Sequence, residues 1–250
     1  MSVHANPNAN PLHTYGRSGS STRHSKDRAL TEREFELLLE AAKRVAANPQ
    51  IYDPEPEMMV YVMGRLGLRR GELVHLQEDW IDWREKMIRI PAHSPCSTGR
   101  DGGHCGMCRQ LAAQRLEYND ELDLEDAVAW MWTPKTEAGV RDVYFGHDVR
   151  AEMLLERYFA PPEIDQFLVT GSSVSRRIDR IADEAEEIDA ADVHPHGLRA
   201  TAATHMASSG LGTYAITQFF GWERADVAER YIARNSTSTA RQLEGVYTRR

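Results

Sequence analysis

The chain has 250 residues, enough for one sizeable hydrophobic core or for a domain with a small appendage. Its formal net charge of -8 disfavours a polyanionic partner, but both ends are net positive, so the charge does not exclude DNA. No run of about 18 apolar residues and no apolar N-terminal stretch occurs, so we expect a cytoplasmic protein with neither a membrane span nor a secretion signal.

The first element expected in the chain is a helix that begins near residue 30. Residues 1–29 are rich in Asn, Pro, Ser, Gly and His, lack apolar periodicity and are predicted to be a flexible basic tail. Thr31 and Glu34 then form a capping-box pattern. Apolar residues follow at helical spacing: Phe35, Leu38, Leu39, Ala42 and Val45.

Further helices and two short strands follow in the pattern. Apolar spacing predicts helices over 57–66 and 70–77, and β-branched runs predict strands over 87–91 and 140–145. Helical patterns then cover 148–159, 172–187, 197–210, 213–220 and 224–234. The predicted fold class is mainly α (α+β), with a small antiparallel sheet near the N-terminal third of the chain.

Between the two strands lies an insert, residues 92–126, that contains all three cysteines. His93-x-x-Cys96 and Cys105-x-x-Cys108 are two short ligand pairs that could complete a tetrahedral zinc site. His104 competes with His93 for the fourth position. Such a zinc ion would be structural, because protein ligands would fill all four positions. The alternative is three free thiols in a loop.

Four further segments contain residue types that could act on a phosphate group. They are Arg69 with Glu72 three residues later, Lys135 before a turn, His196-x-x-Arg199 at the start of a helix, and Trp222 followed nine residues later by Tyr231. Each has an ordinary alternative: a surface arginine, a loop lysine, a helix-capping histidine or two aromatic core residues. The nearby His194 could also be mistaken for His196.

In this order and spacing, these residues resemble the catalytic domain of tyrosine recombinases, the phage integrase family. In that family, about 23 residues separate the second arginine from a His or Trp, and the tyrosine follows nine residues later. The same intervals separate Arg199, Trp222 and Tyr231. The resemblance covers residues 30–234. It implies a site-specific enzyme that breaks and rejoins double-stranded DNA without a metal ion, ATP or another cofactor in catalysis.

The resemblance also implies a role for each residue. Arg69 and Arg199 would bind the reacting phosphate, since guanidinium groups stay protonated and form paired hydrogen bonds with phosphate. Tyr231 would be the nucleophile that forms a 3′-phosphotyrosine bond, and His196 would accept its proton. The remaining roles are a phosphate hydrogen bond from the indole of Trp222 and protonation of the leaving 5′-oxygen by Lys135. Tyr247 is an alternative nucleophile that does not fit the spacing.

The chain departs from the family pattern at its N-terminus. Family members usually carry an N-terminal helical domain that closes around the DNA, whereas only the tail 1–29 precedes the helices here. We therefore expect a separate DNA-binding partner to replace that domain. Recombination in this family joins four protomers, so we expect a homo-oligomer, a tetramer on synapsed DNA. Residues 235–250 are the candidate contact between protomers.

Lysine is scarce, since Lys26, Lys43, Lys86 and Lys135 are the only lysines among 30 basic residues. Abundant carboxylates with few lysines indicate adaptation to high salt, where the Debye length falls to roughly 3 Å and repulsion between acidic surfaces and DNA is screened. The resemblance is accordingly to integrases of halophilic archaea.

Three other functions are consistent with parts of the sequence. A recombinase-like domain could bind DNA without cutting it and act as a regulator. A topoisomerase-like enzyme would use the same chemistry to relax supercoils without a partner site. The insert alone would fit a zinc-dependent interaction protein. A covalent DNA adduct would distinguish a recombinase from a non-cleaving regulator. A preference for particular DNA sites would distinguish a recombinase from a topoisomerase-like enzyme.

Overall fold

Helix α1, Glu32–Ala46, begins at the capping box expected from the sequence. The backbone N–H of Glu34 donates to Thr31 Oγ1 at 3.3 Å, and the backbone N–H of Thr31 donates to Glu34 Oε2 at 2.7 Å. The computed structural model that shows this describes residues 29–117 and 123–232. The predicted tail up to residue 28 and the C-terminal segment with Tyr247 therefore lie outside the described residues.

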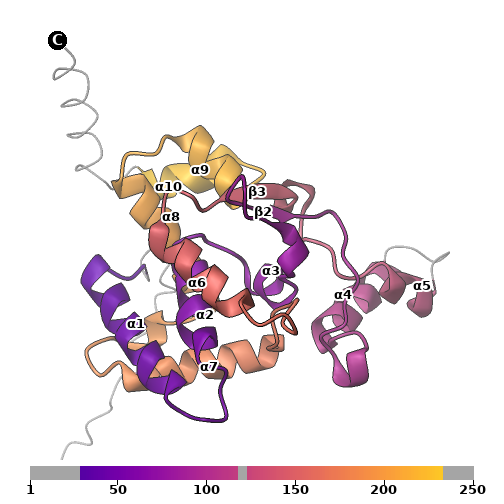
Figure 1. The fold of residues 1–250 in the computed structure, drawn as a ribbon. Helices are drawn as coiled ribbons and strands as arrows, with labels where there is room; N and C mark the ends of the chain where they lie inside the picture. The colour runs from indigo at the N-terminus through magenta and orange to yellow at the C-terminus, as the bar shows by residue number, and fades with distance from the viewer. Residues whose placement is uncertain (1–28, 118–122, 233–250) are drawn as a thin grey trace, which may run out of the picture.

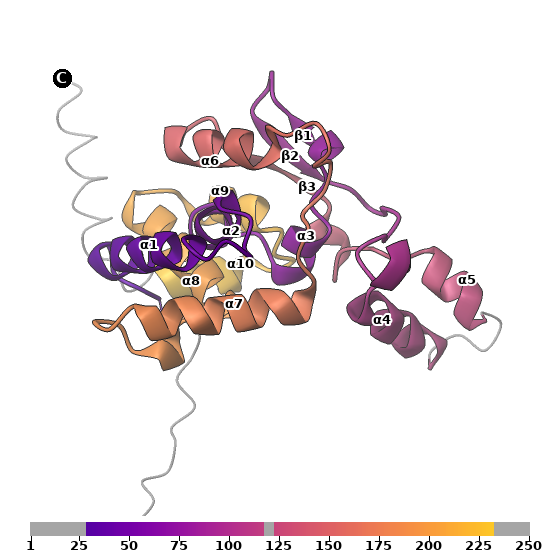
Figure 2. The ribbon, with the colours of Figure 1, turned by 60° about the horizontal axis from the view of Figure 1, so that its bottom comes forward.

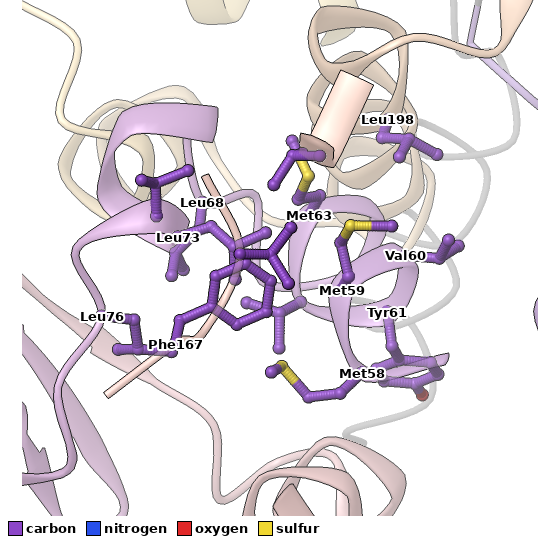
Figure 3. Packing of buried hydrophobic residues seen from close by; sticks show 14 of the residues in the cluster. Met58, Met59, Val60, Tyr61, Met63, Leu68, Leu73, Leu76, Phe167 and Leu198 are labelled. Carbon is purple, nitrogen blue, oxygen red and sulfur yellow. The ribbon is translucent and has the colours of Figure 1, made fainter. Parts of the chain in front are cut away.

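Helix α2, Pro54–Gly64, lies at the centre of the main hydrophobic core, and all of its residues are buried. It begins three residues before the predicted start, because Pro54 occupies a first-turn position that needs no backbone donor. Figure 3 shows Met58, Met59 and Met63 of this helix in the core together with Phe167. Helix α2 thereby positions the glycine-containing turn that leads to Arg69.

Four more helices pack around this centre. Helix α6, Val149–Phe159, and helix α8, Pro195–Ser208, both contact α2. Helix α7, Gly171–Glu184, packs against α1 and against the short helix α3, Arg70–Val74. Figure 2 shows α7 along one side of this bundle, opposite α6 and the sheet. Helix α3 ends three residues earlier than predicted.

The small sheet has three antiparallel strands in the order β1-β2-β3. Strand β1 is Ile81–Asp82, strand β2 is Met87–Ile90 and strand β3 is Arg141–Tyr144. Ile88 of β2 pairs with Val143 of β3, and both are fully buried. Both predicted strands are therefore confirmed, and so is the fold class of a mainly helical protein with a small antiparallel sheet.

The last two helices form a second, smaller hydrophobic cluster with the C-terminal half of α8. Helix α9, Thr213–Phe220, ends at Gly221, and helix α10, Ala225–Ile232, packs on both α8 and α9. Helix α9 also contacts β3. These contacts place α9 beside β3, with α10 packed on α9 (Figure 1).

The insert contains more regular structure than the sequence predicts. After the 3₁₀ turn η3, Arg100–Gly102, it forms helix α4, Gly106–Leu116, and helix α5, Leu124–Ala129. These helices project to one side of the body, next to α3 (Figures 1 and 2). Three 3₁₀ turns complete the described elements: η2, Glu78–Trp80; η4, Glu137–Gly139; and η5, Ala190–Asp192.

None of the helices within 29–117 and 123–232 combines the length and the apolar character needed to cross a bilayer.

Candidate active site

The six residues singled out in the sequence gather at one place in the fold. Two cavities, of 490 Å³ and 400 Å³, share four lining side chains: Arg69, Lys135, His196 and Arg199. The smaller cavity is also lined by Trp222, whose ring stacks on that of Tyr231 with centroids 5.4 Å apart and planes 10° apart. The fold thus brings together residues that lie up to 162 positions apart in the chain.

Arg69 is held in place from both sides of its guanidinium group. Arg69 directly precedes α3. Its Nη1 donates to Glu72 Oε1 on α3 at 2.7 Å, and its Nη2 donates to the carbonyl oxygen of Gly221, which follows α9, at 2.9 Å. Gly221 has a left-handed conformation (φ 57°), and a Cβ there would lie 2.2 Å from the carbonyl oxygen of Ala138. A glycine is therefore required at this position, and it keeps the carbonyl oriented toward Arg69.

Arg199 is buried in the first half of α8. Its Nη1 and Nη2 donate to the carbonyl oxygens of Gly67 and Phe220. Burial, and next the positive charge of Arg69, lower the pKa of Arg199, while Glu72 and Tyr231 oppose this shift. Tyr231 therefore lies within electrostatic reach of Arg199.

A buried carboxylate, Glu72, connects the arginines to each other. Besides Arg69, it binds Arg141 through two parallel hydrogen bonds, from Nη1 to Oε1 at 2.8 Å and from Nη2 to Oε2 at 2.9 Å. Arg141 Nε also donates to the carbonyl oxygen of Phe219, which ties β3 to α9. Three guanidinium groups, counting Arg199, therefore surround one carboxylate, and this excess of positive charge favours an anionic ligand.

Arg141 is not among the residues that the sequence motifs single out. A signal was present, because the period of two in a strand places residue 141 on the same face as the core residue Val143. A buried arginine needs an acidic partner, and Glu72 was the unassigned carboxylate beside the first arginine.

Glu72 should make the folded protein sensitive to acid. Burial would raise the pKa of Glu72, but Arg141 and then Arg199 and Arg69 outweigh it and lower the pKa to about 2. Because the folded-state pKa lies below the ordinary value of 4.5, the stabilisation is present above pH 4.5 and is lost as the pH falls toward 2. The shift in pKa corresponds to a contribution on the order of 3 kcal/mol from ionised Glu72 to the free energy of unfolding.

Denaturant unfolding as a function of pH measures this contribution. Glu72→Gln should be less stable than wild type at neutral pH and should lose most of the difference below about pH 3. Glu40→Gln, which changes an exposed carboxyl group on α1, serves as the matched control. If Glu72→Gln were less stable than wild type by the same amount at neutral pH and below pH 3, the lowered pKa of Glu72 would be contradicted.

His196 and Lys135 lie on the open side of the site. Burial of the ring, followed by the positive charges of Arg199 and Lys135, lowers the pKa of His196 below 6.5, so the imidazole is neutral at neutral pH. The cap of α8 is not His196 but His194, whose Nδ1 accepts the backbone N–H of Gly197 at 3.0 Å. The helix-cap alternative for His196 is therefore wrong.

Trp222 and Tyr231 belong to a stack of three aromatic rings. Phe220 and Trp222 have ring centroids 4.8 Å apart with an angle of 19° between their planes, and Tyr231 stacks on Trp222. Phe220 is fully buried, whereas Trp222 and Tyr231 are half-buried. Both residues pack against the second hydrophobic cluster, as core residues would, and Trp222 also lines the 400 Å³ cavity.

The three cysteines also come together, but with a different histidine from the two considered in the sequence. Sγ of Cys96, Cys105 and Cys108 and a ring nitrogen of His75 all lie within 4.8 Å of one another. The ring of His93 instead packs against Trp130, and His104 lines a separate cavity of 530 Å³. The choice of His93 or His104 as fourth member is therefore corrected to His75, which lies outside the insert.

Comparison with known proteins agrees with this geometry. Residues 165–238 match the phage integrase family. The integrase of transposon Tn1549 in complex with circular intermediate DNA superposes with a TM-score of 0.60 at 17% identity, over 90% of this chain and 68% of that one. The same integrase in complex with transposon right end DNA gives 0.58 at 17% identity, over 88% and 66%.

The chain thus spans about two thirds of the length of these solved integrase chains. No curated protein matches it in sequence. Four of the six gathered residues, His196, Arg199, Trp222 and Tyr231, fall inside the segment that matches the family, and Arg69 and Lys135 join them through the fold. The segment 165–238 matches the phage integrase family in sequence, and the chain has the fold of a tyrosine recombinase catalytic domain.

Proposed function

We propose that this protein is a site-specific DNA recombinase that cuts and rejoins double-stranded DNA through a 3′-phosphotyrosine bond to Tyr231. The observation that carries the proposal is the shared lining of two cavities by Arg69, Lys135, His196 and Arg199, with Trp222 and the stacked Tyr231 beside them. The Tn1549 integrase structures, which contain DNA, support DNA as the substrate class.

Arg69 and Arg199 would hold the reacting phosphate. The transition state of transfer between oxygen atoms carries increased negative charge on the non-bridging oxygens, and fixed guanidinium groups stabilise it without reorganising. Both arginines are already fixed by the carbonyl oxygens of Gly221, Gly67 and Phe220. Their orientation therefore costs little when DNA binds.

Proton transfers complete the reaction. The Tyr231 hydroxyl attacks phosphorus and passes its proton to neutral His196, while the bond from phosphorus to the 5′-oxygen breaks and Lys135 protonates that oxygen. The indole N–H of Trp222 would donate to a phosphate oxygen. Because the phosphotyrosine bond conserves the energy of the broken phosphodiester, rejoining needs neither ATP nor a metal ion in the chemical step.

The pKa of His196 gives the cleavage step an expected pH profile. Since the pKa of His196 in the free enzyme lies below the ordinary value of 6.5, the base is protonated only at a lower pH than an ordinary histidine. Single-turnover cleavage rates should therefore stay level around neutral pH and decline with a midpoint below pH 6.5. A decline with a midpoint above pH 6.5 would contradict His196 as the base. His196→Asn should be slower and level throughout.

Trapping a covalent complex tests the proposal directly. In a pool of fluorescent nicked duplexes with randomised sequence, the short fragment that carries the freed 5′-hydroxyl would diffuse away after cleavage, so rejoining fails and the adduct accumulates. We expect a protein–DNA band that survives denaturing gels, disappears with protease and contains a phosphorylated Tyr231 peptide by mass spectrometry. Retention of DNA without an adduct would instead support a non-cleaving binder. Adducts without any enriched DNA sequence would support a relaxing enzyme.

A further inference from the structure

The cluster of His75, Cys96, Cys105 and Cys108 has the dimensions of a tetrahedral metal site. His75 Nε2 lies 3.2 Å from Cys108 Sγ and 3.6 Å from Cys105 Sγ, and all four residues are buried. Zinc bonds of about 2.3 Å to sulfur and about 2.05 Å to nitrogen place neighbouring ligand atoms about 3.6 to 3.8 Å apart in a tetrahedron. The two nitrogen–sulfur separations are close to these values, and all four ligand atoms lie within 4.8 Å of one another.

The hydrogen bonds of His75 leave one ring nitrogen for a metal. Its Nδ1 lies 2.7 Å from the carbonyl oxygen of Gly71, which can only accept, so Nδ1 carries the proton and Nε2 presents its lone pair to the sulfur atoms. The ring also stacks on Trp132, with centroids 5.3 Å apart and planes 18° apart. A backbone carbonyl on the distal nitrogen is the usual outer contact of a metal-binding histidine.

The sulfur atoms are arranged to carry negative charge. The backbone N–H of Cys105 donates to Cys96 Sγ at 3.3 Å, and the backbone N–H of Cys108 donates to Cys105 Sγ at 3.4 Å. Cys105 is also the residue that caps helix α4, so the positive end of the helix dipole faces its sulfur. Three thiolates and one imidazole suit Zn²⁺, and the absence of oxygen ligands from the cluster disfavours Ca²⁺ and Mg²⁺.

We propose that His75, Cys96, Cys105 and Cys108 bind one structural Zn²⁺ that fastens the insert to the catalytic helix α3. Protein ligands fill all four positions, so no position remains for water or substrate. His75 directly follows α3, which begins after Arg69 and contains Glu72. The three cysteines belong to the insert. The metal would therefore join the insert to the end of α3, two segments between which β1 and β2 lie in the sequence.

The same site also reaches the segment that leads to Lys135. Ser94 and Trp132 exchange two backbone hydrogen bonds, of 2.9 Å and 2.6 Å, and the N–H of Cys96 donates to the carbonyl oxygen of Met131 at 3.2 Å. Met107 of α4 lines the same 490 Å³ cavity as Arg69. If the proposed recombinase function holds, the zinc ion positions both an arginine of the phosphate clamp and the proposed acid, Lys135.

Metal analysis of the full chain, purified without added zinc, tests the ligand assignment and does not depend on any DNA activity. Wild type should contain one zinc per chain, and His75→Ala and Cys108→Ser should each lose it. His93→Ala and His104→Ala are matched controls that should retain it. Loss of zinc in His93→Ala with retention in His75→Ala would overturn the assignment, as would wild type that stays metal-free after refolding with Zn²⁺.

Cobalt substitution keeps the test decisive where a variant fails to fold. Co²⁺ in the wild-type site should show thiolate-to-cobalt charge transfer for three sulfur ligands. His75→Cys should change this spectrum to that of a four-thiolate site, whereas His93→Cys should leave it unchanged. A wild-type spectrum without thiolate ligation would overturn the proposal.

Hydrogen exchange tests the connection to α3. Removing zinc with a chelator under reducing conditions should increase exchange in residues 70–76 and 131–135 as well as in the insert, and should leave α1 unchanged. Increased exchange in the insert alone would overturn the role in positioning α3. This measurement stands apart from adduct trapping, so failure of the zinc proposal and failure of the recombinase proposal are distinguishable.

Discussion

Tyr231→Phe should abolish covalent attachment to DNA and leave the fold and DNA binding nearly intact. The variant keeps the aromatic ring that stacks on Trp222 at 5.4 Å, so the packing of α10 beside Ala228 is preserved. A purely structural tyrosine would lose at most a hydrogen bond worth about 1 kcal/mol, and the chemistry would not change. For a nucleophile, no other atom at that position can form the bond to phosphorus. The measurement is the denaturing-gel adduct assay, with thermal unfolding as the check on folding.

Two tyrosine variants serve as controls. Tyr214→Phe removes a hydroxyl from a side chain that is 78% exposed on the neighbouring helix α9, and it should form the adduct at the wild-type rate. Tyr247→Phe tests the alternative nucleophile. A Tyr231→Phe protein that still forms the adduct, together with a Tyr247→Phe protein that does not, would move the nucleophile to Tyr247.

The sequence predicted the elements that depend on local patterns. The capping box of Thr31 and Glu34 marks the start of α1, and two β-branched runs became the paired strands β2 and β3. The order and spacing of Arg199, Trp222 and Tyr231 indicated a family whose fold the structure has. These features are encoded within short stretches of chain, where spacing alone determines which residues can share a face.

The partners that sequence reasoning missed depend on long-range contacts. Arg141 lies 69 positions from Glu72, and His75 lies 33 positions from Cys108. His93 looked preferable as a ligand because it is only three positions from Cys96, but its ring faces Trp130. Sequence proximity does not determine which side chains meet once the chain crosses between α3, the sheet and the insert.

The insert illustrates the same limit in its secondary structure. The sequence patterns predict no helix between the two strands, yet α4 and α5 form there because they can pack on each other and bury Cys108 and Ala112. Local propensity is weak over such short helices, and tertiary contacts determine the outcome. The halophilic character expected from the scarcity of lysine stays a prediction.

Arg69→Ala should slow cleavage roughly 100- to 1,000-fold while DNA binding and stability change little. Removing one preorganised donor from a developing negative charge costs roughly 3 to 4 kcal/mol of activation free energy in comparable sites. Glu72 would keep its paired hydrogen bonds of 2.8 Å and 2.9 Å from Arg141, so the buried carboxylate stays satisfied and the fold persists. The cleavage rate is measured in single-turnover reactions on a duplex that carries a site recovered from the covalent adduct. DNA binding is measured separately, so that an effect on cleavage can be told from an effect on binding.

Arg70→Ala is the matched control, because it removes the same positive charge from the neighbouring position. The side chain of Arg70 donates to Ser175 on α7 and not to Glu72. If Arg69 acted only through long-range attraction of DNA, both variants would weaken binding alike and would cleave bound DNA at the wild-type rate. If Arg69 contacts the reacting phosphate, only Arg69→Ala slows the cleavage of bound DNA. Arg199→Lys should slow it as well, because an ammonium group cannot replace two fixed bonds to the carbonyl oxygens of Gly67 and Phe220 while also reaching the phosphate. Unchanged cleavage in Arg69→Ala would remove this arginine from the proposed clamp.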